Sequence, residues 1–326
     1  MQDRIEERAR QLDEIRKSKS LRRSDIDEDL YAEPFDLEKA VITSDAVIDQ
    51  LFEDILTPTK DDSATMPWPK THATFRYRPG EVTLYAGGNG GGKSLVTGQI
   101  ALGLIAQGKR VCIASFEMKP KRTLYRMLRQ YARENIETLG FATKTVPEHL
   151  EALEIFTKNK LWFYDQQGTV TSRQVIAMCR FCAVELKITH IFVDSLMKCV
   201  PGEDDYNAQK SFIDHLTAVA RDHNVHIHLV HHIRKLSSEE VTPNKNDVKG
   251  TGAIADQVDN VLLIWRNKKK EHDRQIGAAV DPMSADMRIM CEKQRNGETE
   301  EWYNLFYHRE SQQFVETWDA RPMEFL

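Results

Sequence analysis

EVTLYAGGNGGGKSLVTGQIALGLIA, residues 81–106, joins an apolar, β-rich run to a glycine-rich loop and then to an apolar helical segment. A strand that leads into glycines, a Lys-Ser pair and a helix is the context of a phosphate-binding loop. Glycines let backbone N–H groups converge on phosphate oxygens, and the helix N-terminus adds a partial positive charge. A chance match in a Gly-rich turn is the alternative, but the flanking elements favour a P-loop. The loop comprises Gly87, Gly88, Asn89, Gly90, Gly91, Gly92, Lys93 and Ser94.

The P-loop predicts a partner carboxylate elsewhere in the chain. Lys93 is expected to reach the β- and γ-phosphates of a bound triphosphate, and Ser94 to ligate Mg²⁺. The largely apolar run 188–193 ends in Asp194, which fits the acidic residue that holds the magnesium water shell. The sequence therefore predicts a nucleoside triphosphatase that uses ATP, or another NTP or dNTP, with Mg²⁺.

Glu117 is the candidate catalytic base. It follows the apolar run 110–116, and in open parallel sheets ligands bind at the carboxyl ends of the strands. A glutamate there can orient or deprotonate the water that attacks the γ-phosphate. The alternative is a carboxylate that caps the next helix, and the residues alone leave both interpretations open.

From residue 75 onward, apolar β-rich runs alternate with helical patterns, which predicts a mostly parallel sheet with helices on both faces. No long helix separates the last two strands, so an antiparallel edge is expected. The fold class is therefore α/β. The predicted strands are 81–86, 110–116, 161–164, 190–194, 226–231, 260–265, 287–292 and 302–307, and the predicted helices are 93–107, 119–135, 172–186 and 207–222.

Composition agrees with a protein of the cytoplasm. Hydrophobic residues make up 40% of the chain and charged residues 29%, and no run approaches the roughly 18 apolar residues of a membrane span. The charged N-terminus lacks the apolar stretch of a secretory signal. Cys179 and Cys182 form a CxxC pair without a second pair to complete a zinc site, so buried thiols are expected. The net charge of −5 does not exclude nucleic acid, because binding depends on the local field.

Residues 1–60 differ from the rest and are predicted to be a helical extension ahead of a motor domain at 61–326. Apolar residues at helical spacing define one face of a second helix, which needs a partner surface. A neighbouring subunit and the chain's own domain both remain possible partners. The residues of this face are Ile48, Leu51, Phe52, Ile55 and Leu56.

Four segments together resemble a known family. They are SFEMKPKRTLYRML (115–128), HIHLVHHIRK (226–235), DVKGTGAIADQVDNVLLIWRN (247–267) and EKQRNGETEEWYNLFYHRESQQF (292–314). In this order and spacing they resemble the RecA-type motor domain of hexameric replicative helicases, the DnaB-like and phage primase-helicase group. The resemblance covers about residues 75–317. It departs from the family in that 60-odd residues cannot hold a collar or primase domain, so a motor-only member of phage or plasmid type is expected.

The resemblance implies roles for individual residues. The family's catalytic glutamate falls on Glu117, and its γ-phosphate sensor falls on His232, with His231 as a rival. Arg295 corresponds to an arginine finger that reaches a neighbour's γ-phosphate, and Lys293 assists it; two solvated cations at a hairpin end are the alternative. Two weaker correspondences, Arg266 and Tyr307, stand where the phage branch sandwiches the nucleotide base.

The segment 234–252 is the candidate DNA-binding loop. It is long and polar, and backbone N–H groups near Gly250 and lysine side chains can follow a phosphate backbone without reading bases. A second loop, 199–207, is acidic, which puts its contact with DNA in doubt. The candidate contacts are Lys235, Lys245, Lys249 and Gly250.

These features together predict a ring-forming, Mg²⁺- and NTP-dependent DNA helicase. It would form a homo-oligomer, with a hexameric ring expected, move on single-stranded DNA with the 5′→3′ polarity that the family implies, and work with a primase or loader. Two alternatives remain at this point. One is a RecA-type recombination or signalling ATPase, and the other is a non-catalytic partner that joins or blocks a host helicase ring.

Overall fold

The computed structural model describes residues 10, 21–32, 44, 48, 62–138, 145–200, 202, 205–238, 240–250 and 252–326. The apolar helix predicted at 48–56 lies outside the described residues except for Ile48, and so does nearly all of the charged segment 1–20. No described helix is long and apolar enough to cross a membrane.

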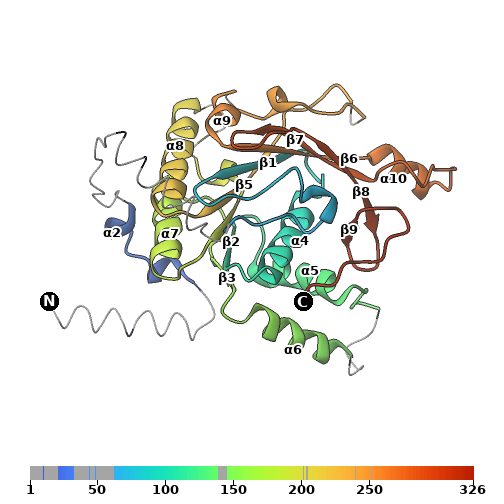
Figure 1. The fold of residues 1–326 in the computed structure, drawn as a ribbon, viewed down its shortest axis with the longest axis horizontal. Coiled ribbons are helices and arrows are strands. Elements are labelled where there is room, and N and C mark those ends of the chain that lie inside the picture. The colour runs from blue at the N-terminus through green and yellow to red at the C-terminus, as the bar shows by residue number, and fades with distance from the viewer. Residues whose placement is uncertain are drawn as a thin grey trace.

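The centre of the protein is one nine-stranded sheet with the strand order β3-β2-β4-β5-β1-β6-β7-β8-β9 (Figure 1). The six strands from β3 to β6 are parallel, and the pairs from β6 to β9 are antiparallel. The predicted α/β fold with an antiparallel edge is therefore confirmed. Only the short ninth strand escaped prediction. The strands are β1 (Val82–Gly87), β2 (Val111–Ser115), β3 (Leu161–Phe163), β4 (His190–Asp194), β5 (His226–His232), β6 (Asn260–Arg266), β7 (Met287–Gln294), β8 (Trp302–His308) and β9 (Gln313–Val315).

Helices cover both faces of the sheet, with α7 and α8 on one side and α4, α5 and α6 on the other (Figure 1). Four of the described helices, α2, α6, α9 and α10, match none of the predicted helix ranges. The helix α6 leaves Leu150 and Ile155 exposed, and α10, KKKEHDRQ, is charged all round, so neither has a clear apolar stripe. The helices are α2 (Glu28–Ala32), α4 (Lys93–Ala106), α5 (Pro120–Ala132), α6 (Thr145–Thr157), α7 (Ser172–Val184), α8 (Tyr206–Asp222), α9 (Gly252–Gln257) and α10 (Lys268–Gln275).

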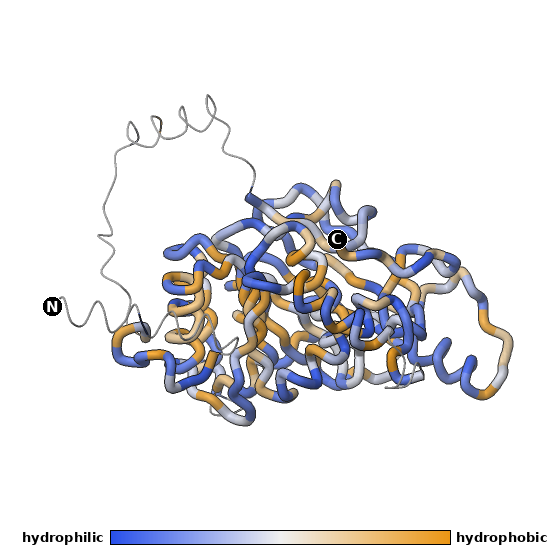
Figure 2. Tube along the Cα trace, turned by 90° about the horizontal axis from the view of Figure 1, so that it is seen from below, coloured by the Kyte–Doolittle hydropathy of each residue, from blue (hydrophilic) through white to orange (hydrophobic). Residues whose placement is uncertain are grey.

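The sheet separates two hydrophobic cores, because successive side chains of a strand point to opposite faces. Along β1, Leu84 packs into the core under α7 and α8, and Tyr85 packs into the core under α4 and α5. Figure 2 shows hydrophobic residues gathered between the elements and hydrophilic residues along the outer helices. Cys179 and Cys182 are buried in the first core as free thiols, as predicted.

Part of the N-terminal extension packs on the same body. Leu21 pairs with Tyr164 next to β3, and Tyr31 of α2 is buried against Phe181 of α7 with ring centroids 5.3 Å apart. Arg180 is fully buried there, and its guanidinium donates to the carbonyl oxygens of Tyr31 at 3.0 Å and of Ala32. These bonds make burial of the charge tolerable, because a buried cation needs hydrogen-bond acceptors.

A cluster of histidines lies inside the sheet on the α4 side. His190 and His228 share a hydrogen bond of 3.0 Å between their rings, and His228 also bonds the hydroxyl of Tyr85 at 3.0 Å. His226 bonds the Thr83 hydroxyl at 2.8 Å and the Arg78 carbonyl oxygen at 2.7 Å. Burial lowers the pKa of His190 and His228 well below the ordinary value, and lowers the pKa of His226 to about 4.

These neutral histidines make the fold sensitive to acid. The unfolded chain protonates each histidine near its ordinary pKa of about 6.5, whereas the folded chain does not, so stability is present above that value and is lost as the pH falls. We expect the free energy of unfolding to fall by about 1.4 kcal/mol per pH unit for each buried histidine between about pH 6.5 and 5. Denaturant titrations at several pH values measure this slope. His190→Gln should flatten it, and the same change at the exposed His215 should leave it unaltered.

Candidate active site

The P-loop leaves the carboxyl end of β1 between β5 and β6 and enters α4. Its first glycine is required by close packing, because a Cβ on Gly87 would lie 2.6 Å from the carbonyl oxygen of Ile264 in β6. Gly92, which caps α4, has φ of +85°, and a Cβ there would lie 2.8 Å from the Met287 methyl group. Only glycine meets both demands without strain, so the sequence pattern and the local backbone agree.

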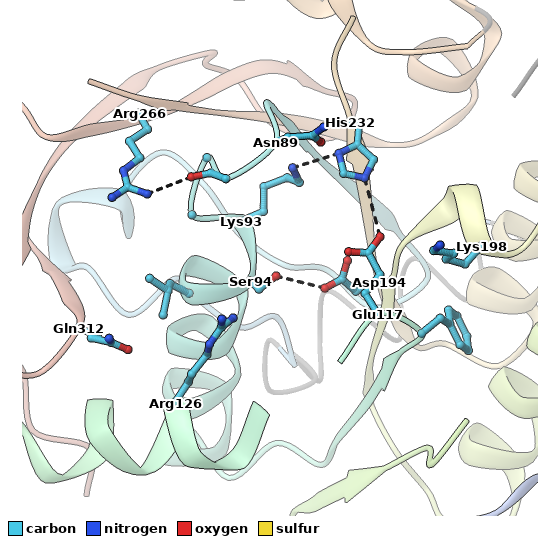
Figure 3. Close-up of a pocket in the computed structure, with 15 residues that line it drawn as sticks. Asn89, Lys93, Ser94, Glu117, Arg126, Asp194, Lys198, His232, Arg266 and Gln312 are labelled. Carbon is cyan, nitrogen blue, oxygen red and sulfur yellow. Dashed lines mark hydrogen bonds and ion pairs between the residues drawn. The ribbon is translucent and has the colours of Figure 1, made fainter. Parts of the chain in front are cut away.

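The structure brings Lys93, Ser94 and Asp194 together (Figure 3). The Lys93 ammonium donates to the carbonyl oxygens of Gly87 and Gly88, each at 2.9 Å, and is largely buried. Ser94 Oγ donates to Asp194 Oδ2 at 3.3 Å, although the two residues are 100 positions apart in the sequence. Burial and the nearby Glu117 carboxylate raise the pKa of Asp194 to about 6. Such a carboxylate would gain from a cation beside it.

The donor set fits the magnesium ion that a P-loop implies. Mg²⁺ prefers oxygen ligands and is usually held by one or two protein groups, with phosphates and water completing the shell. The Ser94 hydroxyl and the Asp194 carboxylate supply such oxygens at the mouth of the P-loop.

Glu117 and His232 face the same cleft from neighbouring parts of the sheet. Glu117 lies just beyond β2, and its Oε1 accepts a hydrogen bond from Ser195 Oγ at 3.2 Å. His232 ends β5, with Nε2 4.0 Å from Glu117 Oε1 and Nδ1 3.4 Å from Lys93 Nζ (Figure 3). Glu117 is therefore positioned near the phosphate site rather than as a helix cap, since the cap position of α5 belongs to Lys119.

The two adjacent histidines of β5 have different surroundings. His231 is fully buried on the other face of the strand, and its Nε2 lies 2.6 Å from the carbonyl oxygen of Lys249. Burial lowers its pKa to about 4. Alternation along the strand therefore places His232, and not His231, in the cleft. His231 instead bonds the candidate DNA loop near its end, at Lys249.

A cleft of about 870 Å³ opens in front of the P-loop, and a second hollow of about 350 Å³ adjoins it. Arg266 lines both, donating to the Gly90 carbonyl oxygen at 2.9 Å and to Glu271 at 2.7 Å. Tyr307 lines the second hollow beside Phe314, with ring centroids 5.3 Å apart. The candidate base-binding pair thus lies around one hollow next to the P-loop.

Three polar residues of the lining were missed by the sequence analysis: Arg126, Lys198 and Gln312. Arg126 of α5 points into the cleft near Ser94 (Figure 3). A signal for it existed, since Arg126 stands three residues after Thr123 and four before Gln130, both buried on the same helix face. Lys198 and Gln312 follow strands β4 and β8 across short turns, and no local pattern marks them.

Lys293 and Arg295 lie at the other end of the strands from the P-loop, beside the first residues of β6. The Lys293 ammonium donates to the carbonyl oxygens of Ala255, Asp256 and Val258 at 3.0, 2.6 and 2.7 Å, at the end of α9. Arg295 lies 3.3 Å from the buried carboxylate of Asp259, just before β6 begins.

The candidate DNA loop folds back on β5. Lys249 N donates to the His232 carbonyl oxygen at 2.9 Å, and Arg234 N donates to the Asp247 carbonyl oxygen at 2.7 Å. Lys235 and Lys245 are exposed, whereas Lys249 and Gly250 are half-buried. In the acidic loop, Asp205 caps α8 by accepting from Ala208 N at 2.9 Å, which gives one of its carboxylates a structural role.

A glycine-rich loop after a central parallel strand, with a lysine, a serine and a carboxylate from another strand of the sheet, defines a RecA-like P-loop nucleotide triphosphatase. The sequence profile of the DnaB-like helicase C terminal domain matches residues 72–316, and the chain belongs to that family. Its function is accordingly of the helicase type, that of an NTP-hydrolysing helicase domain that binds nucleotide.

Solved structures share the fold. One of them, solved as an ATPase domain, superposes with a TM-score of 0.71 at 15% identity, over 85% of this chain and 99% of that one. A DnaB-like replicative helicase, solved in a study of its interactions with primase, superposes with a TM-score of 0.67 at 15% identity, over 85% of this chain and 67% of that one. At this identity the likeness concerns the fold.

Glu117→Gln tests the candidate base. The amide keeps the size and the hydrogen bond from Ser195 but cannot accept a proton, so hydrolysis should fall by on the order of 10²–10⁴-fold while nucleotide affinity is retained. Phosphate release and equilibrium binding of a fluorescent nucleotide measure the two quantities. Unchanged turnover would remove Glu117 from the chemistry.

Proposed function

We propose that this protein is a ring-forming, NTP-dependent DNA helicase motor that translocates 5′→3′ on single-stranded DNA in phage- or plasmid-type replication. One observation supports the ring: the P-loop and Arg295 lie at opposite ends of the strands of one sheet. Membership in the DnaB-like family supports the remaining parts of the proposal, which are the 5′→3′ direction, the replication context, the cytoplasm of the host and a primase or loader as partner.

The distance between Arg295 and the P-loop supports a second subunit, provided that Arg295 acts on a γ-phosphate. The strand β6 runs from Asn260, next to Arg295, to Arg266, which bonds the P-loop. Seven residues at about 3.3 Å each span about 20 Å, beyond the reach of an arginine side chain. Arg295 can therefore reach a γ-phosphate only on another copy that stacks head to tail. Such heterologous contacts generate a ring when the rotation closes, and a hexamer is the number we propose.

The residues of the cleft divide the chemistry of hydrolysis among them. Lys93 leaves the carbonyl oxygens of its own loop to bind the β- and γ-phosphates, and Glu117 orients the attacking water and takes its proton. Ser94 and Asp194 would hold Mg²⁺, which when bound neutralises charge on the phosphate oxygens. Arg295 of the neighbour, assisted by Lys293, stabilises the charge that develops in the transition state. In other P-loop enzymes such an arginine raises the rate of hydrolysis by about 10³–10⁵-fold. Arg266 and Tyr307 hold the base.

His232 couples the nucleotide to the DNA loop. Its ring lies between Lys93 and Glu117, and its carbonyl oxygen accepts the N–H of Lys249. A shift of His232 on loss of the γ-phosphate would therefore move Lys249 and Gly250 through a backbone hydrogen bond. Lys235 and Lys245, both exposed on the same loop, complete the proposed contact with the DNA backbone.

A RecA-type recombination or signalling ATPase is the second candidate, because the same head-to-tail contact builds a filament when the rotation does not close. Electron microscopy of the protein with a non-hydrolysable nucleotide and a short single strand separates rings from filaments. A non-catalytic partner of a host ring is disfavoured by the complete set of Lys93, Ser94, Asp194 and Glu117 in one cleft.

Mixing two inactive variants tests the finger in trans. Lys93→Ala removes the phosphate lysine, and Arg295→Ala removes the finger, so each variant alone should lose nearly all hydrolysis. In mixed rings the Arg295→Ala subunits keep Lys93 and can receive an intact finger from Lys93→Ala neighbours, which should restore up to about a quarter of the sites in an equal mixture. Steady-state hydrolysis against the mixing ratio measures this. A mixture that stays inactive, although both variants join the ring, would place the finger elsewhere.

Replacing Lys245 and Lys249 together by alanine tests the DNA loop. Binding of single strands should weaken for all sequences, and the salt dependence of binding should flatten by about 1.4 units of slope for two lost phosphate contacts. Fluorescence anisotropy over a salt series gives both values. The double change Lys158→Ala with Lys160→Ala, beside β3, is the matched control and should alter neither. An unchanged slope at Lys245 and Lys249 would remove them from the DNA contact.

A further inference from the structure

The turn that carries Arg295 has an unusual set of exposed side chains. Between β7 and β8 the sequence reads RNGETEEW, residues 295–302, which we term the finger hairpin. Trp302 is 55% exposed, although a tryptophan side chain ordinarily finds cover. Three carboxylates accompany it on the surface: Glu298, Glu300 and Glu301. The hairpin thus combines a large apolar anchor with negative charge, next to a single arginine.

The finger hairpin is held in shape by hydrogen bonds to the end of β7 and to the segment before β1. Gln294 Nε2 donates to the carbonyl oxygens of Thr299 and Thr74, each at 2.9 Å, and Asn296 Nδ2 donates to Glu81 at 2.7 Å. A hairpin ordered before it binds loses less conformational entropy on docking than a loose one.

A groove at the other end of the strands is complementary to the finger hairpin in charge and in hydrophobicity. A hollow of about 740 Å³, which we term the β5–β6 groove, lies between the DNA loop and the end of β6 and borders the P-loop. Its described lining has no acidic residue. The basic lining residues are Arg234, Lys235, Lys249, Arg266 and Lys268, and the apolar ones are Ile233, Leu236, Val241, Pro243, Ile264 and Trp265.

The groove and the nucleotide cleft share a wall. Asn89, Gly91 and Arg266 line both, so whatever fills the β5–β6 groove lies directly beside the phosphates of a bound nucleotide. A segment docked there can therefore present an arginine to the cleft.

We propose that the β5–β6 groove receives the finger hairpin of a second copy of this chain. Trp302 packs on the apolar floor, and the three glutamates face Arg234 and Lys268 of the basic rim, the two rim residues assigned neither to DNA nor to the nucleotide. Arg295 is thereby aimed at the neighbouring cleft. The inference rests on the proposed ring and specifies the surfaces that set its register. Tryptophan and arginine are the residues that most often dominate such interfaces, and complementary charge fixes orientation.

A DNA strand is the rival occupant of the groove, since its rim is basic. Six apolar side chains line the groove, however, and only Trp265 among them offers a ring on which a base could stack. The apolar floor therefore favours a protein segment with an aliphatic or aromatic anchor over a phosphate backbone.

Charge reversal tests the docking on the full chain with a non-hydrolysable ATP analogue and Mg²⁺ and without DNA. One variant reverses the hairpin, Glu298→Lys with Glu300→Lys, and one reverses the groove, Arg234→Glu with Lys268→Glu. Each alone sets like charges against each other at every contact, so assembly measured by analytical ultracentrifugation should weaken at least tenfold. In an equal mixture, a reversed hairpin can meet a reversed groove, and an unchanged hairpin can meet an unchanged groove. Every contact then joins opposite charges, so the mixture should reassemble. The chain with all four changes should also reassemble.

A second pair of variants separates docking from folding. Trp302→Ser removes the anchor from the surface of the protomer, so the folded protomer should remain while assembly weakens at least tenfold. Ile155→Ser on α6, which is 67% exposed at the other end of the sheet, is the matched control and should assemble normally.

Four outcomes decide the matter. Recovery of assembly in the mixture and in the fourfold variant supports the docking. Wild-type chain that assembles and hydrolyses ATP, with both reversed variants assembling equally well, overturns the docking but leaves the proposed ring intact. Groove variants that assemble normally but lose single-strand binding assign the groove to DNA and overturn the docking. A wild-type chain that does not assemble overturns the ring and the docking together.

Discussion

The parallel pairing of β1 between β5 and β6 is the constraint on which the site depends. Parallel strands bring their carboxyl ends to one edge of the sheet, and there the P-loop, Asp194, Glu117 and His232 meet from four different strands. The close approach of Gly87 to the Ile264 carbonyl oxygen fixes where the loop leaves the sheet. A side chain at Gly87 would push β1 and β6 apart and move Lys93 with them.

Charge in the cleft is balanced for a ligand rather than for the protein itself. Burial and the neighbouring Glu117 raise the pKa of Asp194, and burial lowers the pKa of Lys93. Both groups are therefore held in surroundings that disfavour their charges, which a magnesium–triphosphate complex would offset. Lys93 meanwhile bonds two carbonyl oxygens of its own loop, so binding exchanges those bonds for phosphate contacts.

The same sheet connects the cleft to the proposed DNA loop and to the finger hairpin through hydrogen bonds to the backbone. His232 at the end of β5 holds Lys249 of the DNA loop, and Lys293 at the end of β7 holds the last carbonyl groups of α9, which continues from that loop. The segment proposed to touch DNA is thus tied near its end, at Lys249, to the candidate γ-phosphate sensor, and the helix that follows it is tied to the strand that leads into the finger hairpin.

Local sequence determined the P-loop, the positions of eight strands along the chain and the α/β class, because glycine spacing and hydrophobic period act over a few residues. It also singled out Asp194 and Glu117 as candidates, since each follows an apolar strand, whereas His232 became a candidate only through the resemblance to the helicase family. Only the tertiary structure showed that His232 lines the cleft and His231 does not, because the alternation of the strand sends the His231 ring into the interior. It alone revealed Arg126 in the cleft, and the full separation of Arg295 from the P-loop. Those facts depend on which strands are neighbours and how their edges align, and pairing between residues 100 or more positions apart leaves no mark in any short stretch of sequence.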